Sequence, residues 1–437
     1  MKKIVLLTIV FLCSITLITN SDSVQSEEAD EFIYLPIISK PKSPFWSKTY
    51  PEQRYKDFAV TSDGEHLVLA SDTSYGFTLA KLDADGEPVW EKTGSTYSMQ
   101  PIEVTATDDG NIIITGYTSD NLWAAKFSNT GTLIWQKNYS YNQHDGDAFA
   151  LIPTNNGGVA IAGYTEQDSD IDYWILNLDK NGGIIWQKTF GGDKTDVATL
   201  IKKTPDNGFI VSGYTYSFGP LSYTWVIKLN SSGNLVWQKM LQGEYSWDLI
   251  NDATVAPDGS SYFSGNKTND SGNGVVDWWV FKLDASGNLA WSKTIDITGS
   301  TDSRGGKIFA LDNNNIYVSG SSYKDKWNPM LFNFDKDGNA RWHKIYEHGV
   351  AIQNIDSQVI TITGYFNGDF MIAKSNLSGD VIGCSAATQT DVTILNITKR
   401  IQTTNSSLSS PTISIENTAF SVTNSTFPSS QELVCGG

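Results

Sequence analysis

One run of carboxylates in the sequence has the spacing of a metal-binding loop. Asp168, Asp170 and Asp172 alternate with a serine and an isoleucine between two apolar runs. A hard cation such as Ca²⁺ takes about six to eight oxygen ligands, which clustered aspartates can supply. In the helical calcium loop, however, glycine occupies the position where this run has Tyr173. A solvated loop is therefore the preferred interpretation; calcium is kept as an alternative, and no other cofactor is predicted.

No other group of side chains forms a recognisable catalytic motif. The sequence has no His-Glu-x-x-His, no Gly-x-Ser-x-Gly and no phosphate-binding loop, and its histidines are scattered. A pair of carboxylates contributed by distant segments would leave no local motif, yet such a pair is what a glycoside hydrolase requires. An enzyme is thus disfavoured, and a hydrolase with hidden carboxylates is the alternative.

Aromatic residues outside the regular pattern of the chain are the other candidates for a binding site. Trp247, Trp278 and Trp327 break the register that the other tryptophans keep, and Phe218 and Tyr223 belong to a long loop. An aromatic side chain that repeated packing does not require can offer a flat apolar surface to a ligand. These five residues and the three aspartates above are the predicted ligand-binding residues.

The elements that would position these residues come from an internal repeat. The unit Gly-x-(apolar)-x-Trp-x-Lys recurs with its tryptophans 44 to 54 residues apart. A period of this length is typical of a repeat whose unit is one four-stranded blade. The repeated tryptophans, predicted to pack between neighbouring blades, are Trp46, Trp90, Trp135, Trp186, Trp237, Trp291 and Trp342. A second register, predicted to be core, contains Trp123, Trp174, Trp225 and Trp279.

Four strands can be read in each unit. In the fourth unit they cover residues 197–204, 209–215, 223–229 and 235–239, with Asp, Asn and Gly in the turns. Seven such units between residues 41 and 385 predict an all-β fold, a seven-bladed β-propeller with little helix. Residues 45–50 are predicted to supply or cover the outer strand of the seventh blade, so that the two ends of the repeat close the ring.

The chain beyond the repeat has a different composition. Residues 386–437 are rich in Ser, Thr and Asn, with short alternating runs at 392–397, 412–416 and 420–422. This segment is too short for a core of its own, so a short C-terminal β-rich extension, a flap tied to the propeller, is predicted. Cys384 and Cys435 are the even pair left in an exported chain and are predicted to form a disulfide.

The first residues predict export. Two lysines, an apolar run and a polar sequel form the pattern of a secretory signal peptide over residues 1–21, and an acidic linker follows over 22–40. Lipidation at Cys13 is disfavoured because Leu12 stands where that signal needs a small residue. No later segment has the length of a transmembrane helix, and the net charge of −17 argues against nucleic acid as a partner. We therefore predict a secreted or cell-surface protein, and a monomer.

The join between the third and fourth strands resembles that of a known class of propellers. Lys282-Leu-Asp284-Ala-Ser-Gly287-Asn-Leu-Ala-Trp291 resembles the tryptophan-docking repeat of quinoprotein-like β-propellers, and the whole repeat looks like that of many secreted bacterial and archaeal surface proteins. The resemblance covers residues 41–385 and implies the fold and the packing of tryptophan between blades, but no activity. Quinoprotein dehydrogenases have eight blades and a pair of adjacent cysteines, so a quinone cofactor is not predicted.

Loop lengths indicate which face of the propeller binds. The second-to-third loops, such as 165–172, 215–223 and 267–277, vary, whereas the other hairpin turns are short and alike. Because these loops open on the same face as the blade-to-blade connections, we expect Asp170, Phe218 and Gly274 on one rim. The predicted function is a non-catalytic scaffold that binds a surface glycan or a protein through this rim. The alternative is an exported carbohydrate-active hydrolase with a carboxylate pair at the channel mouth.

Overall fold

The structure, a computed structural model, describes most of the chain between residues 47 and 432. The described residues are 47–50, 55–71, 76–95, 99–118, 121–141, 146–167, 170–242, 248–268, 276–297, 300–324, 326–346, 351–355, 359–366, 369–380, 392–396, 400–402, 407–409, 413–416, 421–424 and 431–432. The chain divides into two units, Met1–Lys42 and Ser43–Gly437, and all described residues belong to the second. The predicted signal peptide, linker and disulfide lie outside them, as do Trp46, Asp168, Trp247, Cys384 and Cys435.

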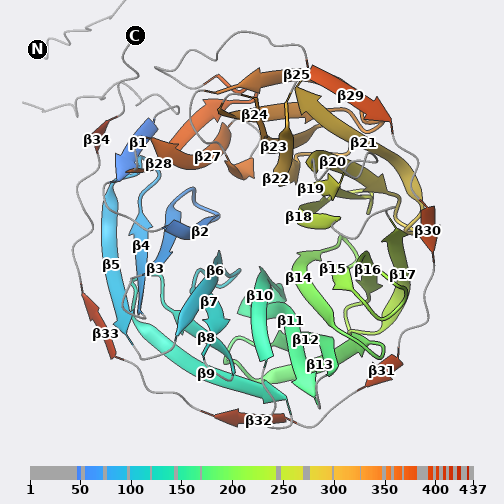
Figure 1. Cartoon of the computed structure of the whole chain (residues 1–437). Coiled ribbons are helices and arrows are strands. Elements are labelled where there is room, and N and C mark those ends of the chain that lie inside the picture. Colours follow the sequence, from blue (N-terminus) through green and yellow to red (C-terminus); the bar gives the residue numbers. More distant parts are fainter. Residues whose placement is uncertain are drawn as a thin grey trace, which may run out of the picture. The chain divides into compact units, whose positions relative to one another are not determined.

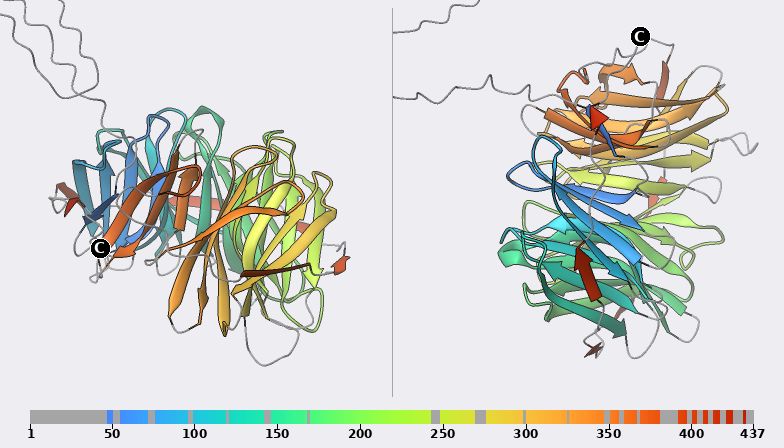
Figure 2. Two further views of the ribbon diagram at one scale, coloured as in Figure 1. Left: turned by 90° about the horizontal axis from the view of Figure 1, so that it is seen from above. Right: turned by 90° about the vertical axis from the view of Figure 1, so that its left-hand side faces the viewer.

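Seven antiparallel sheets follow one another around a ring in the second unit (Figure 1). Each sheet is one blade, and Figure 2 shows the blades from two further directions. The turns that join the strands place glycine at positive φ, as at Gly86 and Gly131, where a side chain would be strained. The predicted all-β, seven-bladed propeller is confirmed. One short 3₁₀ turn, Asn155–Gly157, is the only helical element in the described part of the chain.

Each blade runs from an inner strand to an outer strand in chain order. Blade one contains β2 (Tyr55–Val60), β3 (His66–Ser71), β4 (Gly76–Leu82) and β5 (Pro88–Ser95). Blade two contains β6 (Gln100–Ala106), β7 (Ile112–Tyr117), β8 (Leu122–Phe127) and β9 (Leu133–Tyr141). Blade three contains β10 (Gly146–Pro153), β11 (Val159–Gln167), β12 (Asp170–Leu178) and β13 (Ile184–Gly191). Blade four contains β14 (Asp196–Lys203), β15 (Phe209–Thr215), β16 (Tyr223–Leu229) and β17 (Leu235–Gln242).

The remaining three blades follow the same order. Blade five contains β18 (Leu249–Val255), β19 (Ser261–Thr268), β20 (Val276–Leu283) and β21 (Leu289–Ile297). Blade six contains β22 (Asp302–Ala310), β23 (Ile316–Tyr323), β24 (Trp327–Phe334) and β25 (Ala340–Ile345). Blade seven contains β26 (Ala351–Ile355), β27 (Val359–Phe366), β28 (Asp369–Asn376) and, from the start of the chain, β1 (Ser47–Tyr50).

Closure of the ring takes place in blade seven. The strand β1 pairs antiparallel with β28, with Ser47 opposite Ala373 and Tyr50 opposite Phe370. The buried Tyr50 hydroxyl donates to the backbone oxygen of Gly86 in blade one at 2.7 Å. The predicted role of residues 45–50 as the outer strand of blade seven is therefore confirmed for the described residues, and their tyrosine also joins the first and last blades.

The repeated tryptophans join each blade to the next. Their indole N–H groups donate to backbone oxygens in the following blade, from Trp90 to Asn129 (2.9 Å), Trp135 to Lys180 (2.9 Å), Trp186 to Ser231 (3.0 Å), Trp237 to Ala285 (3.2 Å) and Trp291 to Lys336 (3.0 Å). A Cβ added to the turn glycine of the following blade would contact the same indole ring, for example at 3.2 Å between Gly182 and Trp135. The glycine and the tryptophan of the repeat are thus two halves of one joint between blades.

Alanine at a docking glycine should therefore cost more than alanine at a free turn glycine. Gly287 has φ +81°, and its Cβ would lie 2.9 Å from the Trp237 ring; Gly110 has φ +75° with nothing within 4 Å. Gly110→Ala carries only the backbone strain of about 1–2 kcal/mol. We expect Gly287→Ala to lower the free energy of unfolding by about 1–3 kcal/mol more, because the indole must also move. Denaturant midpoints of the two variants measure the difference, and equal losses would contradict the joint.

The C-terminal segment forms a belt of short strands around the outside of the ring (Figure 1). Six strands pair antiparallel with the outer strands of six different blades, namely β29 (Val392–Asn396) with β21, β30 (Arg400–Gln402) with β17, β31 (Ser407–Ser409) with β13, β32 (Ile413–Glu416) with β9, β33 (Ser421–Asn424) with β5 and β34 (Gln431–Glu432) with β1. Blade six has four strands in the part of the chain that the structure describes. The segment is β-rich and tied to the propeller, as expected, but it is spread over six blade edges and does not form one flap, because each strand finds its hydrogen-bond partners on a different blade edge.

No helix among the described residues has the length and apolar character that a membrane span requires.

Candidate functional site

The variable loops share one face of the propeller. Asp170 begins β12 and Phe218 lies in the loop before β16, and these are equivalent third strands of blades three and four. The Phe218 loop contacts the connection that leads into blade four, because the Ser217 hydroxyl donates to the backbone oxygen of Lys194 at 3.1 Å. We call this face the variable-loop rim and the opposite face the turn rim. The expected common rim is confirmed for Asp170 and Phe218, while Gly274 lies outside the described residues.

Two of the predicted ligand-binding aromatics lie in the core instead. Trp278 is fully buried, its indole N–H donates to Ser264 Oγ at 3.0 Å, and its ring fills the space left by Gly305 and Gly320 of blade six. Tyr223 is also buried. A break in the tryptophan register thus did not mean exposure, since glycines in the next blade made room for the ring. Phe218 is half-buried and packs edge-on against Trp225.

Trp327 belongs to an exposed group of side chains on blade six. Its side chain is 42% exposed and that of Tyr323 is 39% exposed, with the ring centres 5.5 Å apart. The Arg304 guanidinium lies 5.1 Å from the Trp327 ring and donates to both carboxylate oxygens of Asp302. The register explains the grouping, because Asp302 pairs with Tyr323 and Tyr323 with Trp327 across β22, β23 and β24. We call these four residues the blade-six patch.

An acidic cluster occupies the same rim between blades three and four. Burial and the neighbouring charges of Asp170 and Asp196 raise the pKa of Asp172 to about 7. The pKa values of Asp170 and Asp196 are also raised by burial and by nearby carboxylates, with Asp193 acting on Asp170. Spacing identified Asp170 and Asp172, whereas Asp193 in the blade connection and Asp196 at the start of β14 were missed. In the described ranges no three His, Cys, Asp or Glu side chains are already arranged as a metal site.

The inner strands carry a second cluster of charges that the sequence did not reveal. All seven have a register shift, and Asp57, Glu103 and Asp252 stand directly after the shifts in β2, β6 and β18. Such bulges redirect side chains, here at the same level of each blade. Lys202 of β14 makes an ion pair with Asp252 Oδ1 at 2.9 Å, and Lys307 of β22 interacts electrostatically with all three carboxylates.

Each of these inner carboxylates also joins two blades. Asp57 Oδ2 accepts the backbone N–H of Val104 at 2.8 Å, Asp252 Oδ2 accepts that of Ile308 at 3.0 Å, and Glu103 accepts that of Leu151. Burial, and then the Asp57 charge, raise the pKa of Glu103 to about 7. For Asp252 the burial effect is outweighed by Lys202 and Lys307, which lower its pKa. The cluster therefore has both a structural role and one carboxyl group poised near neutral pH.

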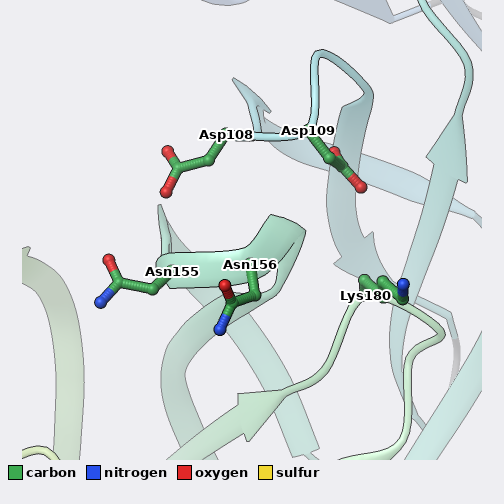
Figure 3. Close-up of a pocket in the computed structure, with 5 residues that line it drawn as sticks. All are labelled: Asp108, Asp109, Asn155, Asn156 and Lys180. Carbon is green, nitrogen blue, oxygen red and sulfur yellow. The ribbon is translucent and has the colours of Figure 1, made fainter.

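Two hollows open on the turn rim. One, of about 690 Å³, is lined by Asp108, Asp109, Asn155, Asn156 and Lys180 (Figure 3). The other, of about 480 Å³, lies beside it at the ends of the inner strands β2, β6 and β26 and shares Asp108. Their walls are turns, which the repeat makes for structural reasons.

The walls of the first hollow are held by a buried lysine. Lys126 Nζ donates to Asp109 Oδ2 at 2.7 Å and to the backbone oxygen of Gly157 at 2.8 Å, linking the turns of blades two and three. Burial opposes ionisation of Asp109, but hydrogen bonds from Lys126 and Thr107 prevail and hold its pKa at about 2. Asp109 is therefore a fixed structural anion, and we do not assign this hollow a ligand.

Comparison with known proteins supports the fold but not a family. No protein-family description and no curated protein matches the sequence. Among solved structures, an ulvan lyase from a new family of polysaccharide lyases, solved with a bound saccharide, is 12% identical with a TM-score of 0.52, covering 76% of this chain and 94% of its own. BamB from Moraxella catarrhalis is 12% identical (TM-score 0.41; 74% and 83% covered), and Sqt1 from Chaetomium thermophilum is 10% identical (TM-score 0.48; 77% and 99% covered). At 12% identity and a TM-score of 0.52, the likeness to the ulvan lyase concerns the fold alone, and the quinoprotein-like relationship stays a resemblance.

Proposed function

We propose that the protein is an exported, secreted or cell-surface scaffold that binds a glycan or a protein partner through the variable-loop rim without catalysis. The observation that carries this proposal is the blade-six patch. A tryptophan and a tyrosine that remain exposed side by side, with an arginine against the ring, are the kind of surface that binding sites use. Because these residues repeat in no other blade, the regular packing of the ring does not require them. The signal peptide predicted from the sequence and the lack of a recognisable catalytic motif support the same proposal.

The inner charge cluster supports one alternative, an exported carbohydrate-active enzyme. Glu103 is buried beside Asp57 with a pKa of about 7, which suits a general acid at neutral pH. Against this stand the backbone N–H groups and lysines that already occupy these carboxylates. A structural role accounts for all of those contacts, so the scaffold is the preferred function.

Replacing Trp327 or Arg304 by alanine should weaken binding strongly without disturbing the fold. Each substitution is expected to weaken binding on a glycan array or to purified surface proteins by about tenfold or more, because both side chains form the exposed patch. The free energy of unfolding should change by less than about 0.5 kcal/mol, as for other surface substitutions. Ile185→Ala is the control, since Ile185 is 61% exposed and lies near the start of β13, next to a turn of the opposite rim.

The outcomes separate the two functions. If both patch variants bound with wild-type affinity, the blade-six patch would not be the binding site. A different result would be that the wild-type protein cleaves one of a panel of polysaccharides and that a folded Glu103→Gln variant loses this activity. This result would favour the enzyme over the scaffold as the function.

A further inference from the structure

The acidic cluster of the variable-loop rim converges above a glycine. A Cβ built on Gly191, the last residue of β13, would lie 1.5 Å from Asp172 Oδ1 and 2.9 Å from Asp196 Oδ2. Asp172 Oδ1 and Asp196 Oδ2, from two neighbouring blades, therefore approach the same small space, which Asp172 can enter only because residue 191 has no side chain. Like charges so close together repel one another unless protons or a cation compensate them.

The cluster also contains carboxylate oxygens without hydrogen bonds. One buried oxygen each of Asp170, Asp172 and Asp196, the Oδ1 atom in every case, has no hydrogen-bond partner among the residues that the structure describes. Asp196 is fully buried. A buried carboxylate oxygen that is left unpaired is costly, so three of them on neighbouring aspartates need an explanation.

Asp196 is held with one oxygen available to a ligand. Its Oδ2 accepts the backbone N–H of Gly192 at 2.9 Å and the Ser217 hydroxyl at 2.7 Å. Together with the Thr215 hydroxyl, these donors fix the carboxylate and favour its ionised form. The Oδ1 atom has no hydrogen-bond partner among the described residues. The side chain is thus oriented from behind, as the ligands of metal sites commonly are.

We propose that Asp172 and Asp196 bind a divalent cation of the calcium type above Gly191, with Asp170 adding negative charge nearby. The available ligands are carboxylate oxygens, which suit a hard cation and not a zinc ion. Calcium tolerates irregular geometry and fills its coordination shell with water and backbone oxygens, so it does not require three carboxylates that already converge. The site would link β12 to the start of β14 and so join blades three and four. This inference is independent of the proposed binding partner.

Thermal unfolding of the full chain with calcium chloride or with EGTA tests the site. For wild type at pH 7.5, a calcium concentration about a hundredfold above the dissociation constant should raise the melting temperature by about 3 °C. Calorimetric titration with calcium chloride should show binding to one site. Asp172→Asn and Asp196→Asn should each abolish both effects. In EGTA, the Asp172→Asn variant should melt no lower than wild type, because the substitution removes the charge repulsion between the aspartates.

The control is Asp337→Asn, which removes the same charge from a turn of blade six where the carboxylate is 63% exposed and paired with Lys336. This variant should keep the whole calcium response. Asp172→Asn is expected to fold even if Asp196→Asn does not, so the test does not depend on one variant. No heat of binding and no change in melting temperature at millimolar calcium in wild type would overturn the proposal. A calcium response that survives in Asp172→Asn would also overturn it.

Discussion

Replacing Lys307 by methionine is expected to lower the free energy of unfolding by about 3–5 kcal/mol at pH 7, as removal of one partner from a buried charge group does. Lys307 interacts with Asp252, Asp57 and Glu103, and these carboxylates raise its pKa. Methionine has a similar length, so the loss would report the uncompensated carboxylates and not a cavity. Denaturant unfolding at several pH values is the measurement.

The loss should depend on pH with a definite sign. Glu103 has a pKa of about 7 in the folded protein, raised from its usual 4.5. Between these values the folded state binds more protons than the unfolded state, so this group makes stability fall as the pH rises through that window. Without Lys307 the carboxylates hold protons still more strongly. The cost of Lys307→Met should therefore be smaller at pH 5 than at pH 8.

An exposed lysine provides the control. Lys336, which pairs with Asp337, is 56% exposed, and Lys336→Met should change stability by less than about 0.5 kcal/mol. A loss below about 1 kcal/mol for Lys307→Met, unchanged between pH 5 and pH 8, would mean that water already screens the inner charges.

Deleting residues 41–50 should destabilise the ring by more than about 5 kcal/mol, since it removes a buried tyrosine together with a closing strand. Tyr50 is fully buried, its hydroxyl bonds to Gly86 in blade one, and β1 lies between β28 and β34. Thermal melts at one scan rate compare this deletion with deletion of residues 22–32, which should have little effect. Equal melting temperatures for the two shortened chains would show that β1 is not needed for closure.

The features that could be predicted from the sequence are those that depend on residues close together in the chain. The turns and the tryptophan that define a blade lie within one repeat, and the repeat recurs at a regular spacing. The seven blades and the closing strand could therefore be predicted from that spacing alone. Asp57 and Lys307 are far apart in the chain, and only the shared level of the inner bulges brings their charges together. For the same reason the spacing of Asp170 and Asp172 indicated a carboxylate cluster, while Asp196, from the next blade, could not be assigned to it.

Two other features depended on partners that the sequence does not mark. Trp278 breaks the repeat, but Gly305 and Gly320 of the next blade decide that it is buried. The alternating runs of the C-terminal segment identified strands near residues 392–396, 413–416 and 421–424, yet nothing in them names the edge with which each strand pairs. The outer edges of the blades offer nearly the same backbone groups, so order along the chain selects among them.

That order gives the belt the properties of a multivalent ligand for its own ring. Each of its strands is two to five residues long and would not stay bound as a free peptide. Joined in one chain, each docked strand holds the next at a high effective concentration, so the affinity of the whole segment far exceeds that of its parts. A single cut between β31 and β32 would divide this avidity between two weaker halves. Six belt strands cover six of the seven blades in the described part of the chain, so a duplicated blade would add a further outer edge without a belt strand unless the tail lengthened with it.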